Sequence, residues 1–326
     1  MLRRCLKLIL PLSVFLALAA FLAPASAADW PSRPVTIIVP FGAGGNTDMM
    51  ARLAAQDLSA KFGQNFIIEN RPSPGGAIGT RIVAQAAPDG YTLLFCASSM
   101  ITLTPQLEKL DFDPVKQLVP ITNVGTGAQV IAIKRSLPVT NLLEFINYAK
   151  ANPGKLNFTV AGTQNLSHFS PVLLFARTSV DVVMVPARSE PQAISDLLSG
   201  VADLYFGNAS ALLPLIKNDS IRLIAVSTPD RLPAVPEIPT IAETLPGFES
   251  SSWNGFLAPV GTPEPIIEAV RNEVTAFVRT PEISQRLTNL GIIPGGLTKE
   301  QIEAVFKHDH DSFAAAIKAV GIASPD

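Results

Sequence analysis

The sequence predicts an α/β fold with mainly parallel sheets, divided into two domains. Short runs of Val, Ile, Leu and Phe alternate with stretches whose apolar residues recur at helical spacing, which is the pattern of strands connected by helices. Glycine-rich turns follow several of the apolar runs, as expected where a strand passes into a helix. The chain has 326 residues, more than a single hydrophobic core usually serves.

The first part of the chain fits three units of a strand followed by a helix. Asp48 is placed to cap the first helix, and Gly63 is placed to end it. In order, we expect a strand over 35–39, a helix through 62, a strand over 66–69, a helix from the glycine-rich segment 74–79 through 87, and a strand over 91–96.

A second set of units follows an irregular stretch around residues 105–114. Asn141, with Glu144 three residues later, has the spacing of a helix cap. The proline-rich residues 229–265 are expected to form a long ordered connection, followed by a helical tail that packs on the first domain. We expect strands over 129–133, 156–160, 181–185, 201–206 and 221–227, and helices over 142–150, 169–176 and 191–198 and from 263, 281 and 298.

The first 27 residues have the features of a secretory signal peptide. Three basic residues precede an uncharged apolar stretch, 8–21, that is too short to span a bilayer comfortably. Ala25-Ser26-Ala27 then provides a small-residue cleavage site. The alternative, a retained membrane anchor, is disfavoured by the short apolar stretch. We therefore expect an exported protein whose mature chain begins at Ala28.

Composition argues against several classes of partner. Removing residues 1–27 takes away three of the 25 basic residues and none of the 27 acidic ones, so the mature charge is 22 − 27 = −5. No cluster of Lys and Arg interleaved with aromatic residues occurs, which argues against nucleic acid. Cys96, the one cysteine after residue 27, lies in an apolar run and is expected to be a buried thiol outside any internal disulfide.

The glycine-rich turn at 42–45 is the candidate anion site. Its glycines leave backbone N–H groups uncovered, and the first turn of the next helix has N–H donors without partners inside the helix, equivalent to about half a positive charge. This arrangement suits a carboxylate or a phosphate. A dinucleotide fingerprint is incomplete, because Thr47 stands at its third glycine, and the Lys-Ser/Thr of a P-loop is missing, so we expect no cofactor.

The sequence indicates no catalytic or metal site. His168 stands beside Ser167, but no Gly-x-Ser-x-Gly motif surrounds any serine, and a structural or ligand-contacting histidine is expected instead. His308 and His310 are two residues apart on a predicted helix and point to different faces, which does not suit a metal. We therefore expect that the protein is not an enzyme.

Motifs along the whole chain after residue 27 carry a resemblance to a known family. They are Trp30-Pro-Ser-Arg-Pro34, Val39-Pro-Phe-Gly-Ala-Gly-Gly-Asn-Thr-Asp48, Glu69-Asn-Arg-Pro72, Pro88-Asp-Gly-Tyr-Thr-Leu-Leu94, Ala151-Asn-Pro-Gly-Lys155, Ser252-Trp-Asn-Gly255 and Ala258-Pro-Val-Gly-Thr-Pro263. In this order they resemble the Bug proteins, extracytoplasmic solute receptors of tripartite tricarboxylate transporters. The resemblance implies a type II periplasmic binding protein fold, in which two α/β lobes close on a ligand. Lobe 1 would contain residues 28–126 and 251–326, and lobe 2 residues 127–250.

The resemblance also implies where the ligand lies. In the family, the first glycine turn and a corresponding turn in the second lobe hold one ligand carboxylate through backbone groups, small polar side chains and ordered water. We expect ligand contacts from Phe41, Gly42, Ala43, Gly44, Gly45, Asn46, Thr47 and Asp48, from Ser98 and Ser99, from Gly162, Thr163, Gln164, Asn165, Ser167 and His168, and from Arg188, Gly207 and Asn208.

Departures from the family pattern concern the choice of ligand. The second turn lacks the usual Gly-Asn-Gly-Thr-Ser before its histidine. Pro186-Ala-Arg-Ser189 replaces a Pro-Tyr-x-Gly segment, which leaves Arg188 either to meet a distal carboxylate or to be a solvated loop charge. Many members carry an aspartate where this chain has Gly207, and that acid suits an ammonium group. We therefore expect a ligand without an amino group.

The expected function follows from the resemblance and the export signal. We expect a monomeric periplasmic receptor that captures a small carboxylate and delivers it to the subunits of a membrane transporter. A receptor of the same fold that reports its ligand to a sensor kinase is the main alternative. A secreted hydrolase is a third possibility, disfavoured by the missing serine motif.

Overall fold

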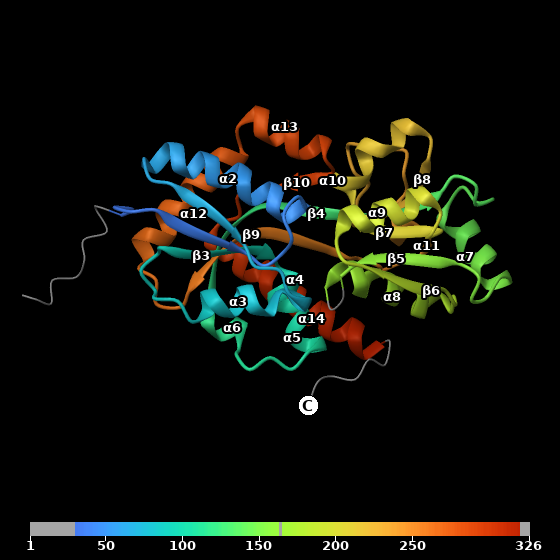
Figure 1. Cartoon of the computed structure of the whole chain (residues 1–326), viewed down its shortest axis with the longest axis horizontal. Coiled ribbons are helices and arrows are strands. Elements are labelled where there is room, and N and C mark those ends of the chain that lie inside the picture. The colour runs from blue at the N-terminus through green and yellow to red at the C-terminus, as the bar shows by residue number, and fades with distance from the viewer. Residues whose placement is uncertain (1–29, 163–164, 320–326) are drawn as a thin grey trace, which may run out of the picture.

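The structure, a computed structural model that describes residues 30–162 and 165–319, alternates strands and helices along the chain (Figure 1). Its N-terminal third contains the three predicted strands and, after them, three short helices that were not predicted. The elements are β1 (Val35–Val39), α2 (Asn46–Phe62), β2 (Phe66–Asn70), η3 (Pro74–Gly76), α3 (Ala77–Ala84), β3 (Thr92–Ala97), α4 (Ser99–Thr102), α5 (Thr104–Leu107) and α6 (Pro114–Gln117).

The middle third contains the second predicted set of units. Its first strand is much longer than the expected 129–133, because the preceding residues also pair in the sheet. The elements are β4 (Leu118–Lys134), α7 (Leu142–Ala151), β5 (Asn157–Ala161), α8 (Leu166–Thr178), β6 (Val183–Ala187), α9 (Glu190–Ser199), β7 (Leu204–Asn208), α10 (Ala209–Leu212), η4 (Leu213–Asn218) and β8 (Ile221–Val226).

The last third corrects the prediction that residues 229–265 form only a connection. Residues 251–259 are a strand that is buried along almost its whole length. Since both of its faces are covered, its sequence lacks the alternation of polar and apolar residues that marks a half-buried strand. The elements are α11 (Ile241–Thr244), β9 (Ser251–Pro259), α12 (Glu264–Val278), α13 (Pro281–Asn289), β10 (Ile292–Pro294) and α14 (Lys299–Ala319).

The described strands form one mixed ten-stranded sheet. Its order is β2-β1-β3-β9-β4-β7-β5-β6, and β8 and β10 each pair with β4. Pairings are parallel within β1–β3 and within β5–β7, and antiparallel wherever β4 or β9 takes part. β4 pairs with β9 as far as Ala128 and with β7 from Gln129 onward. The strands β1–β3, β9 and β10 form the first half of the molecule, and β5–β8 form the second half. The long strand β4 runs through both halves (Figure 1).

Each half of the molecule has its own hydrophobic core. In the first half, α2 and α12 pack on β1, β3 and β9 around side chains such as Leu58, Phe95 and Phe256. In the second half, α7 and α8 pack on β5 and β7 around side chains such as Phe145. Full burial of one such side chain contributes about 1.5–3 kcal/mol. Cys96 is a buried free thiol whose pKa is raised by burial, which confirms the prediction.

The C-terminal helix α14 contacts both halves. Ile302 packs in a cluster with Leu94 of β3 and Leu257 of β9. Further along, the Phe313 ring packs edge-on against the Phe169 ring of α8, with ring centroids 6.0 Å apart. The helical tail therefore packs on the first half, and it reaches the second half as well.

Helix ends follow the predicted signals at several positions, with one correction. The Asn141 side chain accepts a hydrogen bond from the Glu144 N–H, and α2 ends at Gly63 in the left-handed conformation that glycine favours. The prediction that Asp48 caps α2 was wrong. The cap position is Gly45, and Asp48 lies in the first turn of the helix, where its charge still complements the helix dipole.

Candidate functional site

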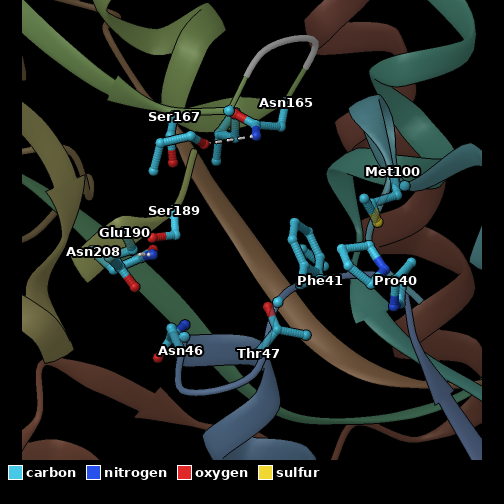
Figure 2. A pocket seen from close by; sticks show the side chains of 18 of the residues that line it. Pro40, Phe41, Asn46, Thr47, Met100, Asn165, Ser167, Ser189, Glu190 and Asn208 are labelled. Carbon is cyan, nitrogen blue, oxygen red and sulfur yellow. Dashed lines mark hydrogen bonds between the residues drawn. The ribbon is translucent and has the colours of Figure 1, made fainter. Parts of the chain in front are cut away.

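Three helices begin at a cavity of about 580 Å³ that residues of both halves enclose. Residues 45–47 at the start of α2, 165–167 at the start of α8 and 189–191 at the start of α9 all line it (Figure 2). Each helix start carries the equivalent of about half a positive charge, and α2 and α8 also present N–H groups without intrahelical partners. In α9, Pro191 has no N–H and the Gln192 N–H donates to the Ser189 hydroxyl. The cavity therefore favours an anion.

The first glycine turn, which the sequence analysis gave as the candidate anion site, lies at the cavity. Of its residues, Phe41, Gly42, Ala43, Gly45, Asn46 and Thr47 line the cavity, whereas Gly44 does not. The Thr47 hydroxyl donates a hydrogen bond to Asn254 Oδ1 of β9 at 2.7 Å. Asn46 Oδ1 accepts one from the Ser210 hydroxyl of α10 at 2.8 Å, so the turn is attached directly to the second half.

Asp48 supports this turn from behind and does not line the cavity. Its Oδ2 accepts hydrogen bonds from the Gly44 N–H at 2.9 Å and from Arg52 Nε at 3.0 Å. Its Oδ1 accepts one from Asn70 Nδ2 at 2.9 Å. Burial alone would raise the pKa of Asp48, but these hydrogen bonds to the charged form outweigh it and hold the pKa below its usual value. Asp48 is therefore an ionised anchor for the turn.

The second predicted turn also reaches the cavity, through Gly162, Asn165 and Ser167. Asn165 caps α8, since its Oδ1 accepts a hydrogen bond from the His168 N–H at 3.1 Å while its Nδ2 donates to the Ala161 carbonyl at 3.1 Å. The helix begins at Leu166, three residues earlier than expected. His168 does not line the cavity, and burial lowers its pKa. Thr163 and Gln164, which were predicted to contact ligand, lie outside the described residues.

Gln129 joins the second turn to the crossing strand β4. It lines the cavity, its Nε2 donates to the Ser167 hydroxyl at 3.2 Å, and its Oε1 accepts from the Ser170 hydroxyl at 2.7 Å. From the sequence, Gln129 was expected only at the start of a strand. Polarity at that position is the signal that was missed, because a buried amide needs partners on the surrounding elements.

Ser98 and Ser99 take different positions after β3. Ser99 lines the cavity, and Ser98 is fully buried behind it. The Ser98 hydroxyl lies 2.9 Å from the hydroxyl of Ser252, which does line the cavity, and donates to Asp309 Oδ2 of α14 at 3.2 Å. Burial raises the pKa of Asp309 to about 6. Ser98 therefore positions Ser252 and links the cavity wall to the C-terminal helix.

The start of α9 brings a carboxyl group into the cavity. Glu190 Oε1 accepts hydrogen bonds from Asn208 Nδ2 at 2.7 Å and from the Tyr205 hydroxyl at 3.2 Å, and Glu190 and Asn208 both line the cavity. Burial raises the pKa of Glu190 and raises that of Tyr205 well above its usual value. Among the described lining residues, Glu190 is the one acid and Arg188, which is exposed, is the one base.

Gly207 does not line the cavity, although the sequence analysis expected it to contact ligand. A Cβ atom at this position would overlap the ring of Tyr205, two residues earlier on the same face of β7. The tyrosine therefore occupies the space that a side chain at 207 would need. Glu190, which accepts from the Tyr205 hydroxyl and from Asn208, is the acid that lines the cavity near this position.

One side of the cavity is apolar. Figure 2 shows Pro40, Phe41 and Met100 grouped together, across the cavity from Ser189, Glu190 and Asn208. Most of this wall and several polar lining residues were not predicted from the sequence. Two signals were present: the second glycine-rich segment, noted only as a helix start, and the Ser252–Gly255 motif. The missed lining residues are Pro40, Pro72, Ser73, Pro74, Gly75, Gly76, Ala97, Met100, Gly127, Gln129, Ala161, Leu166, Pro186, Ala187, Ser189, Glu190, Pro191, Ser252 and Asn254.

Comparisons with known proteins agree on one family. Residues 50–322 match the family model for the tripartite tricarboxylate transporter family receptor. Protein BugT of Bordetella pertussis is 31% identical, over 97% of this chain and 98% of that protein. The solved structure of R. palustris Rpa4515 with adipate has a TM-score of 0.86 and 33% identity, over 90% of this chain and 99% of that one. MatC from Rhodopseudomonas palustris with bound malate has a TM-score of 0.80 and 29% identity, over 88% and 100%.

The fold and the site define a periplasmic solute-binding receptor with a ligand cavity between two α/β halves. The chain belongs to the tripartite tricarboxylate transporter receptor family, whose members are receptors and not enzymes. Receptors of this family are periplasmic. Within residues 30–162 and 165–319, no helix is long and apolar enough to cross a membrane. The predicted signal peptide, residues 1–27, lies outside the described residues.

Proposed function

We propose that the protein captures a small carboxylate in this cavity and delivers it to the membrane subunits of a tripartite tricarboxylate-type transporter. The observation that carries the proposal is the convergence of three helix starts on one cavity. The N–H groups at the starts of α2 and α8 offer hydrogen bonds to an anion, and the dipoles of all three helices add positive potential. The family membership and the adipate and malate bound to related proteins support a carboxylate as that anion.

The proposed binding mode uses both kinds of cavity wall. One carboxylate accepts hydrogen bonds from the Gly42–Thr47 turn and from the start of α8, and the carbon chain lies against Phe41 and Met100. Enclosed sites strengthen such hydrogen bonds relative to water. A ligand that contacts both halves favours their closed arrangement over an open one, which is a shift between two populations. The boundaries proposed for the two lobes are the 126/127 and 250/251 junctions.

We further propose that the ligand has no amino group. Position 207, where related chains carry an acid, has no side chain here, and the Tyr205 ring covers it. The acid in the cavity, Glu190, has its Oε1 engaged by Asn208 and Tyr205 and its Oε2 turned toward the Gly45 turn, so we assign it to the ligand carboxylate and not to an amino group.

A thermal-shift screen tests the function. The panel contains mono-, di- and tricarboxylates, aromatic acids and amino acids, applied to the mature chain from Ala28. A ligand at a hundredfold excess over its Kd stabilises the folded state by about 2.7 kcal/mol. We expect shifts from organic acids. Shifts from amino acids alone would contradict the absence of an amino group, and no shift from any acid would contradict the carboxylate function.

A co-purification experiment tests the partner. We expect the tagged receptor, loaded with the acid that gives the largest shift, to retain membrane subunits of a transporter. Retention of a sensor kinase instead would favour the signalling alternative.

A further inference from the structure

We propose that Glu190 takes up a proton from solvent when a carboxylate binds at the Gly42–Thr47 turn, and then donates a hydrogen bond to that carboxylate. This inference rests on the proposed carboxylate function and deepens it. It makes Glu190 a residue that distinguishes acids from ligands carrying a positive charge or a hydrogen-bond donor at the same place.

The geometry places Glu190 directly opposite the first turn. Its Oε2 lies 3.9 Å from the position that a Cβ atom on Gly45 would occupy, and Glu190 and Gly45 both line the cavity. The second half thus presents a carboxyl group to the turn at which a ligand carboxylate would bind. A bound carboxylate on this turn would lie within contact distance of Glu190.

The two oxygens of Glu190 have different surroundings. Oε1 accepts from Asn208 Nδ2 and from the Tyr205 hydroxyl, and these two donors fix the orientation of the carboxyl. Oε2 is turned toward Gly45. When the carboxyl is protonated, Oε1 keeps both donors and Oε2–H is directed at the turn. A hydrogen bond from a neutral carboxyl to a carboxylate is of the short, strong O–H···O⁻ kind.

The charged groups around Glu190 do not compensate a second negative charge. On α2, Asp48 faces away from the cavity toward Gly44 and Arg52. On β7, Tyr205 stays neutral, since burial raises its pKa well above the usual value. On α8, His168 does not line the cavity. Arg188 lies two residues before Glu190, just before α9; it is exposed and forms none of the ion pairs found among the described residues.

Two carboxylates that share one site do not both remain ionised, because each raises the pKa of the other. Burial already raises the pKa of Glu190, which reduces the cost of protonation. By linkage, a carboxylate that brings one proton with it binds up to about tenfold more tightly for each unit that the pH falls, within the window between the Glu190 pKa values of the free and bound protein. A ligand that offers a cation or a donor to Glu190 gives the opposite slope.

The test is isothermal titration of the mature protein with adipate, malate and benzoate from about pH 6 to pH 8, where these carboxyl groups are largely ionised. Each titration is repeated in two buffers of different ionisation enthalpy, which measures the protons taken up. The variant Glu190→Gln keeps a donor at the same place but does not titrate. Asp196→Asn is the matched control, because Asp196 lies on the same helix, α9, and does not line the cavity.

We expect wild type and Asp196→Asn to take up a proton with the acid that binds, and to bind it more tightly as pH falls. We expect Glu190→Gln to take up none and to show constant affinity, tighter than wild type at pH 8. Binding without proton uptake, an unchanged slope in Glu190→Gln, or weaker binding at low pH would overturn the proposal while leaving the receptor function intact. Failure of every acid in the thermal-shift panel to bind would instead contradict the carboxylate function on which the proposal rests.

Discussion

The substitution Asp48→Asn tests whether a carboxylate outside the cavity holds the anion-binding turn. Asp48 accepts hydrogen bonds from the Gly44 N–H, Arg52 Nε and Asn70 Nδ2. The two carboxylate oxygens of Asp48 both accept hydrogen bonds. In asparagine one of these oxygens is replaced by an NH₂ group, which would face a donor instead of accepting from it. At least one of the three hydrogen bonds is therefore lost, and the rest lose their charge assistance.

The magnitude follows from these contacts. A hydrogen bond to a charged group contributes about 1.5–3 kcal/mol, and we expect a loss of this size in the free energy of unfolding. The Arg52 ion pair is discounted, because the arginine side chain is 52% exposed. The melting temperature should fall by roughly 3–10 °C. Carboxylate affinity should fall by up to about tenfold, since the Gly44 N–H loses the group that orients the turn.

Urea unfolding as a function of pH provides the assay. The folded pKa of Asp48 lies below its unfolded value, so its contribution is complete above the unfolded value of about 3.9 and is lost as pH falls through the folded pKa. The wild-type and Asp48→Asn curves should separate at neutral pH and converge in acid. Arg52→Gln, which removes only the exposed partner, should cost less than about 1 kcal/mol. Equal stability of wild type and Asp48→Asn at pH 7 would refute the role assigned to Asp48.

Four further measurements follow from the structure. Asn165→Ala removes the cap of α8 and should cost about 0.5–2 kcal/mol in a denaturant titration, with weaker carboxylate binding; unchanged binding would separate this turn from the site. Asp309→Asn should gain stability relative to wild type as the pH rises from about 4 to 7, by on the order of 2 kcal/mol, because the folded pKa of about 6 makes ionisation of Asp309 in the folded wild type unfavourable. Parallel curves of unfolding free energy against pH for the two proteins would contradict this. Gly255→Ala should lower the melting temperature strongly, because the added Cβ would overlap the Thr122 backbone. Gly42→Ala should leave it nearly unchanged, because a Cβ at that position meets nothing within 4 Å. Similar melting temperatures of the two variants would contradict the close approach of β4 and β9. Arg188→Ala should leave monocarboxylate affinity unchanged, and a selective loss for dicarboxylates in calorimetry would show that Arg188 meets a distal carboxylate.

The sequence predicted the parts of the fold that local signals determine. Strands of branched apolar residues, glycine ends such as Gly63 and the cap at Asn141 appear where local chemistry requires them. The strand β9 was missed because its place in the centre of the sheet, between β3 and β4, depends on pairing with residues far along the chain. Long-range pairing leaves no periodic trace in a strand that is buried on both faces.

The candidate site divides in the same way. The first turn could be placed because a glycine-rich helix start can be recognised from neighbouring residues. Asn165 was assigned to the site only through the family resemblance, since α8 was expected to begin at 169 and begins at Leu166. Glu190 was missed, although Ser189 and Pro191 mark its helix start, since nothing local shows that α9 points toward the Gly45 turn. Gly207 was assigned to the site from the family pattern. In the structure, the Tyr205 ring occupies the place that a side chain at position 207 would need.

The substitution Gly45→Val tests whether a carboxylate binds at the turn where α2 begins. Gly45 has an extended backbone with φ −81°, and an added Cβ meets no atom closer than 3.8 Å, so the variant should fold and melt near the wild-type temperature. The new methyl groups would occupy the space between the turn and Glu190. Calorimetry with the best-binding acid should then show affinity at least tenfold weaker than wild type, about 1.4 kcal/mol. Unchanged affinity in a folded Gly45→Val protein would contradict the account.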